Sequence, residues 1–277
     1  MGIIYKIKKN KFFNMIVRTI MAPKFMFDNF MFDSKAKKRA NGFIDERYIG
    51  LKKLQNTANV KRCFIVGTGP SLTKKDLLLL KNEKTFCLNS GVKLIDDNIW
   101  IPDYYVIQDK ESFKLLEKEI ISKNEKYFHG NVFIGSSIPL KNYSHFKHYE
   151  YPLNILDHKR YHKKGFGKFK YSGDIYREID DFYTVAISAV QIAIYMGFKE
   201  IYLVGCDCNY KLDKKYSVEY GRKDPYIEVL GDRFIYSYHQ LNNFISSVDV
   251  EIYNATRGGM LEVFPRKNIE DVVNEEK

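Results

Sequence analysis

The stretch that decides the fold is Cys63-Phe-Ile-Val-Gly-Thr-Gly-Pro-Ser-Leu72. Its four leading apolar residues end at a glycine, which is typical of a strand buried on both faces of a parallel sheet. Gly67 and Gly69 let the backbone approach a bound anion closely. The next residues, Thr73-Lys-Lys-Asp76, have the form of a capping box and predict a helix over 76–80.

The same alternation continues along the chain. Further strands are predicted at 85–88, 103–107, 131–134, 200–204 and 250–253, and helices at 112–121, 184–196 and 238–247. Alternating strands and helices indicate an α/β fold, a Rossmann-like and mostly parallel sheet with helices on both faces. Such sheets bind ligands beyond the carboxyl ends of their strands. Polar residues follow the predicted strands at Gly67–Ser71, Asn89, Asp109, Ser136, Asp207 and Asn254.

The net charge of +11 is confined to the beginning of the chain. Residues 1–62 contain 15 Lys and Arg against 4 Asp and Glu, whereas residues 63–277 contain 30 of each kind. A nucleic-acid-binding protein would carry its positive charge on the folded body, so no nucleic acid partner is expected. We predict a basic amphipathic segment over 1–60 and a catalytic domain over 61–277, with an irregular lid around 140–182.

Residues 1–32 place apolar side chains three to five apart with lysines between them, and Pro23 is expected to end this segment. The segment either docks on the body as an extra helix or lies on an anionic membrane through residues 1–40. The basic cluster Lys35–Arg39 favours the membrane. No run approaches the length of about 20 apolar residues needed to span a bilayer, and no signal-peptide pattern is present. We therefore expect a cytoplasmic protein, peripheral at the inner face of the membrane.

Four cysteines, Cys63, Cys87, Cys206 and Cys208, fall in apolar strand-like runs. None has the spacing of a zinc site, so they are expected to be buried, free and reduced, as in the cytosol.

The glycine loop is not a complete dinucleotide motif. Leu72 stands near the place of the third glycine, and Pro70 excludes a Walker loop. Asn89 follows Gly69 by 20 residues, where an NAD enzyme carries an acidic residue for the ribose. An amide can instead bond sugar hydroxyls and a base edge. A plain tight turn remains the alternative to a nucleotide loop.

Two blocks of sequence resemble the bacterial sialyltransferases that use CMP-sugars. The first is Phe64-Ile-Val-Gly-Thr-Gly-Pro-Ser-Leu72 with Asn89, and the second is Ala193-Ile-Tyr-Met-Gly-Phe-Lys-Glu-Ile-Tyr-Leu-Val-Gly-Cys-Asp207. The resemblance covers roughly 63–110 and 183–256 and implies a nucleotide phosphate at the glycine loop. Under this resemblance the nucleotide-binding residues are Gly67, Thr68, Gly69, Pro70, Ser71, Asn89, Gln108, Asp109, Ser136, Thr184 and Asp207.

The resemblance also implies catalytic roles. Tyr210 and Tyr216, six residues apart after Asp207, correspond to tyrosines that stabilise the departing CMP phosphate. His239 corresponds to the base that takes the acceptor proton, or it is an ordinary helix residue, with His158 and His162 in reserve. Thr68 and Thr184-Val-Ala186 depart from the family pattern, which puts sialic acid itself in doubt. No Asp-x-Asp motif follows a strand, so no metal cofactor is expected.

A second stretch, Pro102-Asp-Tyr-Tyr-Val-Ile-Gln-Asp109, resembles the 6-hydroxymethylpterin pyrophosphokinase-like family, which shares the same loop. In that alternative Asp109 and Asp207 would hold Mg²⁺. Arg257-Gly-Gly259 either binds an acceptor or a carboxylate, or forms a simple turn.

Taken together, these features predict a metal-independent glycosyltransferase of bacterial surface polysaccharide synthesis, in the making of lipopolysaccharide or capsule. It would transfer a sugar from a nucleotide-sugar donor, a CMP-sugar, to a glycan or lipid-linked acceptor. The alternatives are the Mg²⁺-dependent pyrophosphokinase and a non-catalytic nucleotide-binding protein. The sequence leaves homo-oligomer formation open.

Overall fold

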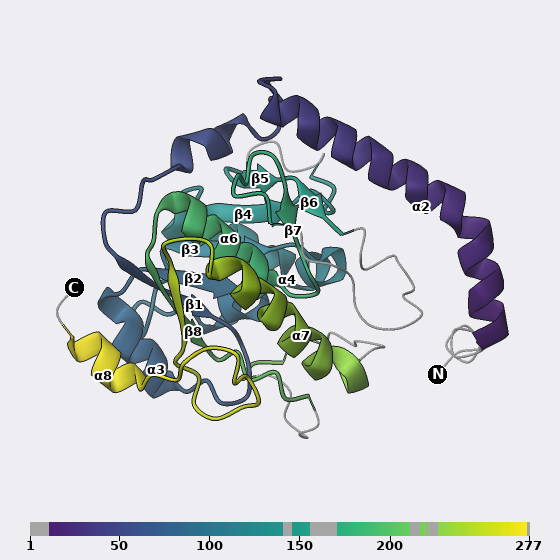
Figure 1. Cartoon of the computed structure of the whole chain (residues 1–277). Helices are drawn as coiled ribbons and strands as arrows, with labels where there is room; N and C mark the ends of the chain where they lie inside the picture. The colour runs from purple at the N-terminus through teal and green to yellow at the C-terminus, as the bar shows by residue number, and fades with distance from the viewer. Residues whose placement is uncertain are drawn as a thin grey trace.

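A seven-stranded sheet, parallel throughout, forms the centre of the protein (Figure 1). The computed structural model describes residues 11–140, 146–155, 171–210, 217–219, 221 and 227–275. Its strand order is β5-β4-β3-β2-β1-β8-β9. The strands are β1 Arg62–Val66, β2 Thr85–Leu88, β3 Tyr104–Ile107, β4 Val132–Gly135, β5 Tyr149–Tyr151, β8 Glu200–Val204 and β9 Glu251–Asn254. Two short strands, β6 Leu153–Asn154 and β7 Ile179–Asp180, form a separate parallel pair.

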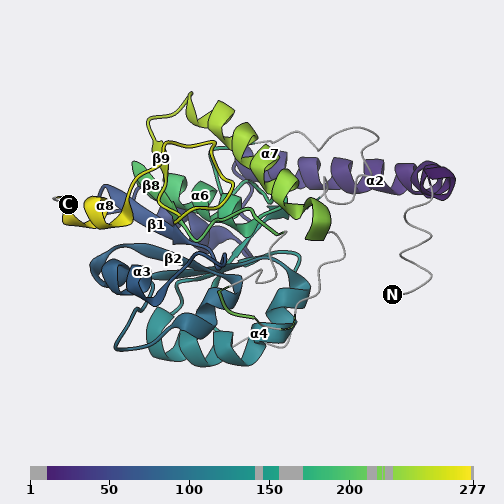
Figure 2. The same ribbon diagram turned by 90° about the horizontal axis from the view of Figure 1, so that it is seen from below.

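Helices cover both faces of the sheet (Figure 2). One face carries α6 Val185–Met196 and α7 Ile227–Ile245, and the other carries α3 Lys74–Leu79 and α4 Lys110–Lys123. The alternation of side chains along β1 explains this arrangement. Cys63 and Ile65 belong to the core beneath α6 and α7, whereas Phe64 and Val66 belong to the core beneath α3 and α4. A strand that is buried on both sides is apolar along most of its length, as Cys63–Val66 of β1 are.

The predicted α/β architecture is confirmed, and all six predicted strands are present within one or two residues. The predicted capping box is also confirmed, because Thr73 and Asp76 exchange side-chain-to-backbone hydrogen bonds at the start of α3. Gly197 ends α6 with a φ of 99°, a left-handed value that favours glycine. All four cysteines are buried, as expected.

Two predictions of local structure in the body are wrong, and one element was not predicted. Helix α7 begins at Ile227 and not at 238, so the predicted helix lacks its first eleven residues. Strands β5, β6 and β7 lie within 140–182, which was predicted to be irregular. Helix α8, Ile269–Asn274, near the C-terminus was not predicted. These elements are short or carry polar residues among the apolar ones, so their periodicity is weak.

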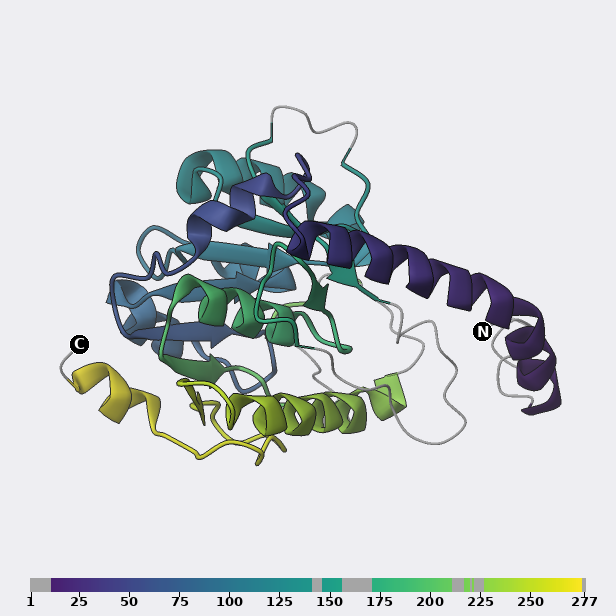
Figure 3. The same ribbon diagram turned by 45° about the horizontal axis from the view of Figure 1, so that its top comes forward.

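Helix α2, Lys11–Ala40, is attached to the body by its own C-terminal end, and the rest of the helix extends away from the body (Figure 3). Pro23 lies inside this helix, so the prediction that it ends the segment is wrong. A proline inside a helix removes one backbone hydrogen bond and can bend the helix without ending it. The buried guanidinium of Arg39 holds the C-terminal end to the body, because it donates two hydrogen bonds to the carbonyl of Arg177 and pairs with Asp45.

A buried ion pair links β1 to the start of β2 and to the C-terminal segment. Nε and Nη2 of Arg62 donate to the two carboxylate oxygens of Glu83 at 3.1 and 2.9 Å. Nη1 of the same guanidinium donates to the carbonyls of Val272 and Glu275. Removal of one partner from such a pair leaves a buried charge without compensation.

We predict that Arg62→Met lowers the free energy of unfolding by about 3–5 kcal/mol, because the buried carboxylate of Glu83 loses its ion pair with the guanidinium. Urea unfolding followed by circular dichroism measures this. The control is Lys61→Met, which removes an exposed partner of Glu200 and should leave the unfolding midpoint unchanged. Equal losses for the two variants would contradict a structural role of the buried pair.

Candidate functional site

A cavity of about 650 Å³ lies at the carboxyl ends of the central strands. It is lined by residues that follow β1, β2, β3 and β8, together with the start of α6 and one face of α7. Strand β1 has β2 on one side and β8 on the other, so the order of the strands reverses here. This is where open α/β sheets leave a crevice for ligands.

Most of the residues predicted from sequence meet at this cavity. Those that line it are Gly67, Thr68, Gly69, Pro70, Asn89, Gln108, Asp109, Thr184, Asp207 and Tyr210. Ser71, Ser136 and Asn254 are not among the lining residues. Ser71 bonds Asp207, the hydroxyl of Ser136 accepts from the backbone of Leu153, and Asn254 is buried at the end of β9. Tyr216, His158 and His162 lie outside the described residues.

His239 lies on an exposed side of α7 and does not line the cavity. The helix turns Leu230, Phe234 and Tyr238 toward the cavity, four residues apart, and the next residue is rotated by about 100° from that face. The assignment of His239 as a base therefore remains a prediction that its position does not support. Among the residues that the structure describes, no histidine lines the cavity.

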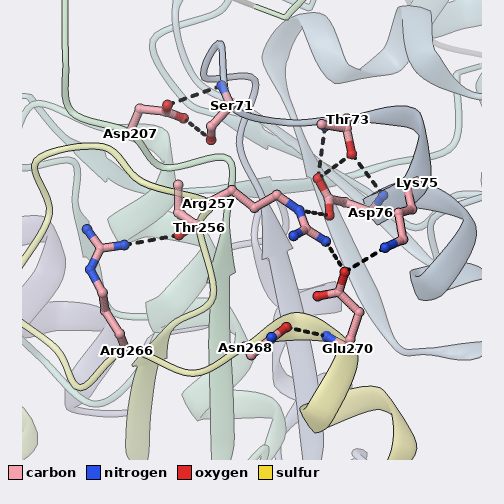
Figure 4. A network of polar contacts seen from close by, with 10 residues as sticks. All are labelled: Ser71, Thr73, Lys75, Asp76, Asp207, Thr256, Arg257, Arg266, Asn268 and Glu270. Atoms are coloured by element: carbon pink, nitrogen blue, oxygen red, sulfur yellow. Dashed lines mark hydrogen bonds and ion pairs between the residues drawn. The ribbon is translucent and has the colours of Figure 1, made fainter.

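The carboxylate of Asp207 joins the glycine loop to the end of β8 (Figure 4). It accepts hydrogen bonds from the backbone N–H of Ser71 at 3.1 Å and from its hydroxyl at 2.8 Å. The contact requires glycine at 69, because a Cβ there would lie 1.9 Å from one carboxylate oxygen of Asp207 and 2.7 Å from the carbonyl oxygen of Gly205. Burial raises the pKa of Asp207, and the hydrogen bonds from Ser71 oppose that shift.

The loop after β9 fixes the start of α3 from the other side (Figure 4). Arg257 donates to Asp76, the partner of Thr73 in the capping box of α3, at 2.6 Å and also pairs with Glu270. Hydrogen bonds from Arg257 and Lys75 lower the pKa of Glu270 to about 2. Arg257 is therefore paired with Asp76 and Glu270 within the protein. The guanidinium that the sequence suggested for binding an acceptor or a carboxylate is engaged in these contacts.

Gln108 presents an amide whose position is fixed from behind. Its Oε1 accepts from the hydroxyls of Tyr151 at 3.1 Å and Ser188 at 2.6 Å, all in the interior. These two donors hold the carbonyl oxygen of Gln108. Its NH₂ group is therefore the part of the amide that can donate to a ligand in the cavity that Gln108 lines.

Asn89 contributes an acceptor that none of the described residues satisfies. Its backbone has a φ of 44°, and the hydroxyl of Tyr105 donates to its carbonyl at 2.9 Å, which supports this unusual conformation. Its side-chain Oδ1 is buried and has no hydrogen-bond partner among the residues that the structure describes. Buried polar atoms are almost always paired, so an unpaired one at a cavity indicates a place for a ligand donor.

Helix α7 and the segment before α6 form a wall that sequence reasoning missed. Arg233 lies with its guanidinium carbon 5.5 Å from the ring centroid of Tyr183, and both line the cavity. Phe234 packs edge-on against Tyr210 at 5.6 Å, and Asp181 is buried at the same wall. The helical spacing of Leu230, Phe234 and Tyr238 could have revealed this wall if the helix had been predicted to start earlier.

Asp109 and Asp207 both line the cavity, as the magnesium alternative requires. Asp109 also caps α4, where it accepts from the N–H of Ser112 at 2.6 Å. In the part of the chain that the structure describes, no group of three or more His, Cys, Asp or Glu is arranged to hold a metal ion.

We predict that Gly69→Ala lowers the free energy of unfolding by roughly 1–3 kcal/mol, because the new methyl group displaces Asp207 or the backbone of Gly205. Thermal and urea unfolding measure the effect. Gly50→Ala is the control, since a Cβ there meets only the ring of Tyr149 at 3.4 Å. An unchanged midpoint for Gly69→Ala would contradict the close contact with Asp207.

Solved structures similar to this chain include three from bacteria. The MAf glycosyltransferase from Magnetospirillum magneticum AMB-1 is 17% identical with a TM-score of 0.49, and the match covers 78% of this chain. This chain spans only 35% of that protein. The alpha-2,3-sialyltransferase Cst-I from Campylobacter jejuni is 18% identical with a TM-score of 0.47, covering 79% of this chain and 83% of that one. The sialyltransferase CstII from the same organism, in complex with cytidine-5'-monophosphate, is 17% identical with a TM-score of 0.43, covering 76% and 85%.

At these values the likeness concerns the fold alone. No curated protein sequence matches this chain. The model of one protein family does match, over residues 44–213, which is more than half of the chain and includes the glycine loop, Asn89, Asp109 and Asp207. The protein therefore belongs to the MptE-like family, described as 6-hydroxymethylpterin diphosphokinase MptE-like.

Proposed function

We propose that this protein is a glycosyltransferase that takes a sugar from a nucleotide-sugar donor bound in the cavity at the carboxyl ends of the strands. The acceptor would be a glycan or lipid-linked hydroxyl of bacterial surface polysaccharide. The two blocks that resemble CMP-sugar sialyltransferases contribute Gly67–Pro70, Asn89 and Asp207 to this one cavity. Its volume of about 650 Å³ is within the range of small-molecule sites.

The observation that carries the proposal is the unpaired side-chain oxygen of Asn89. An amide oxygen at the end of β2 can accept a hydrogen bond from a ribose hydroxyl or from the exocyclic amine of a base. A carboxylate at this place would favour the ribose of NAD, as in dinucleotide enzymes. The amide of Gln108, held by Tyr151 and Ser188, offers a donor in the same cavity.

The proposed reaction breaks the bond between the anomeric carbon and the phosphate oxygen. Its electron pair stays on that oxygen, so a nucleotide leaves with one more negative charge. The acceptor oxygen forms the new bond to the anomeric carbon, and its proton passes to a base in the cavity. The described cavity residues able to take a proton are the carboxylates Asp109, Asp181 and Asp207. Tyr210, and Tyr216 by sequence alone, are proposed to donate to the phosphate without a metal cofactor.

A second candidate is a Mg²⁺-dependent pyrophosphokinase acting on a pterin. Two observations favour it, namely membership of the MptE-like family and the presence of Asp109 and Asp207 at one cavity. Carboxylate oxygens are the ligands that Mg²⁺ takes, and ATP would supply the pyrophosphate. The two candidates therefore differ in nucleotide and in their need for a metal.

We expect CMP to raise the thermal unfolding midpoint without a metal, because a ligand at 100 times its Kd adds about 2.7 kcal/mol to stability. The measurement is a thermal-shift panel of CMP, UDP, GDP and ATP, each with and without Mg²⁺. Stabilisation by UDP or GDP would keep the transferase and reject the CMP donor. Stabilisation by ATP with Mg²⁺ alone would favour the pyrophosphokinase, and no stabilisation by any nucleotide would contradict both candidates.

We further propose that α2 lies on an anionic membrane surface. Among the described residues no helix is long and apolar enough to cross a membrane. The outward face of α2 instead carries Ile20, Met26, Phe27 and Phe30, all exposed, with Phe27 at 62% and Phe30 at 68%. Their spacing places them on one side of the helix, and Ala36 and Arg39 bury the other side at its C-terminal end.

Charge complementarity favours lipid as the partner of this face. The exposed lysines Lys24, Lys35 and Lys38 border the apolar side chains, and residues 1–62 carry all of the surplus positive charge. A helix with aromatic residues on one side and lysines around them binds at the boundary of headgroups and acyl chains.

We predict that the double variant Phe27→Ser with Phe30→Ser loses at least tenfold in affinity for vesicles of phosphatidylglycerol and phosphatidylcholine, measured by co-sedimentation. The control is Leu115→Ser with Ile101→Ser, which removes exposed apolar side chains elsewhere and should bind like wild type. Equal binding by both double variants would contradict the proposal. A wild-type dimer that the Phe27 and Phe30 changes dissociate, with no vesicle binding, would assign the face to a second copy.

A further inference from the structure

Two amide side chains lie at neighbouring strand ends of the cavity. Asn89 directly follows β2 and Gln108 directly follows β3, and both residues line the cavity. The two strands pair with each other in the sheet, with Leu88 beside Val106. Neighbouring strands lie about 4.8 Å apart, so the two amides start from adjacent places at the same end of the sheet.

The amide of Gln108 has a fixed orientation. The hydroxyls of Tyr151 and Ser188 are both buried, and they donate to its Oε1 at 3.1 and 2.6 Å. If the amide were turned over, its N–H groups would face these hydroxyls, and the two hydroxyl protons would lose this acceptor. Gln108 therefore offers hydrogen-bond donors, and not its oxygen, to a ligand in the cavity.

Asn89 offers the opposite kind of group. Its Oδ1 is buried and has no hydrogen-bond partner among the residues that the structure describes. The backbone at Asn89 has a φ of 44°, and the hydroxyl of Tyr105 donates to its carbonyl at 2.9 Å. The protein therefore holds this acceptor in place through a sparsely populated backbone conformation, as is common at ligand sites.

A donor beside an acceptor matches a vicinal diol. Each hydroxyl of a diol both donates and accepts, so one hydroxyl can donate to Oδ1 of Asn89 while its neighbour accepts from the NH₂ group of Gln108. A nucleotide carries such a diol on its ribose. In nucleotide-binding sheets with a glycine loop after the first strand, a side chain about 20 residues further on bonds the 2′-hydroxyl of the ribose. Asn89 follows Gly69 by 20 residues.

We infer that Asn89 and Gln108 together bind the ribose diol of the nucleotide. Asn89 accepts from the 2′-hydroxyl, and Gln108 donates to the 3′-oxygen. This inference rests on the proposed nucleotide donor and deepens it, because it makes the site specific for ribonucleotides over deoxyribonucleotides.

The test compares CMP with 2′-deoxy-CMP and 3′-deoxy-CMP by isothermal titration. Wild type should bind CMP at least roughly tenfold more tightly than either analogue, because each analogue leaves one polar group of the protein without a partner. Asn89→Gly, which accepts a φ of 44°, should bind CMP and 2′-deoxy-CMP within about twofold of each other and keep its preference over 3′-deoxy-CMP. Gln108→Glu should show the converse pattern, because its carboxylate still accepts from Tyr151 and Ser188 but no longer donates to the ligand.

Ratios of affinities separate this effect from general ones. All three ligands carry the same base and phosphate, so an added charge or a loss of folded protein weakens the three together. Asn243→Asp, at an exposed position of α7 outside the cavity lining, is the charge-matched control and should keep the wild-type ratios.

The comparison on wild type alone is decisive, because it needs no variant to fold. Equal affinities of wild type for CMP and both deoxy analogues would overturn the inference and leave the proposed nucleotide donor standing. Wild-type ratios in both Asn89→Gly and Gln108→Glu would also overturn it, because the diol would then be bound by other groups. If wild type bound none of the three ligands, the proposed CMP donor would fail, and the inference would fail with it.

Discussion

The contact on which the site depends is the pair of hydrogen bonds from Ser71 to the carboxylate of Asp207. It joins the turn after β1 to the end of β8, the two strands between which the sheet reverses its order. Gly69 is required because the carboxylate occupies the space of a side chain. The same carboxylate gives the loop a negative neighbour, so the glycines serve close packing of the protein on itself as much as the approach of a ligand.

The central sheet could be predicted because its strands are short, mostly apolar and followed by glycine or polar residues, as Cys63–Val66 shows. What failed is explained by weaker local signals. Pro23 is a sequence signal for the end of a helix, yet α2 continues to Ala40. The proline removes one backbone hydrogen bond, and this loss does not outweigh the helix-forming residues around it. The predicted helix starts too late because Gly231 and several polar residues interrupt the apolar pattern in the first turns of α7. Leu230, in these turns, is buried at the cavity, and no local pattern reveals that.

The position of the site was also predictable, since the carboxyl ends of parallel strands bring Gly67, Asn89, Asp109 and Asp207 together whatever the family. The details were not. His239 was chosen because it was the histidine nearest the expected position, yet the helix turns it away from the cavity. The place of Arg233 at the cavity could not be predicted from sequence. The ring of Tyr183, which its guanidinium lies over, is 50 residues earlier in the chain, and the two come into contact only in the folded protein.

The most direct test of this account is a crystal structure of the protein grown with CMP. The account predicts the nucleotide in the cavity at the carboxyl ends of the strands, with one of its donors bonded to the side-chain oxygen of Asn89 and with the contact between Ser71 and Asp207 intact. A phosphate bonded to Ser71, with Asp207 displaced from the loop, would contradict the central claim. CMP bound outside the cavity at the carboxyl ends of the strands would contradict the assignment of the site itself.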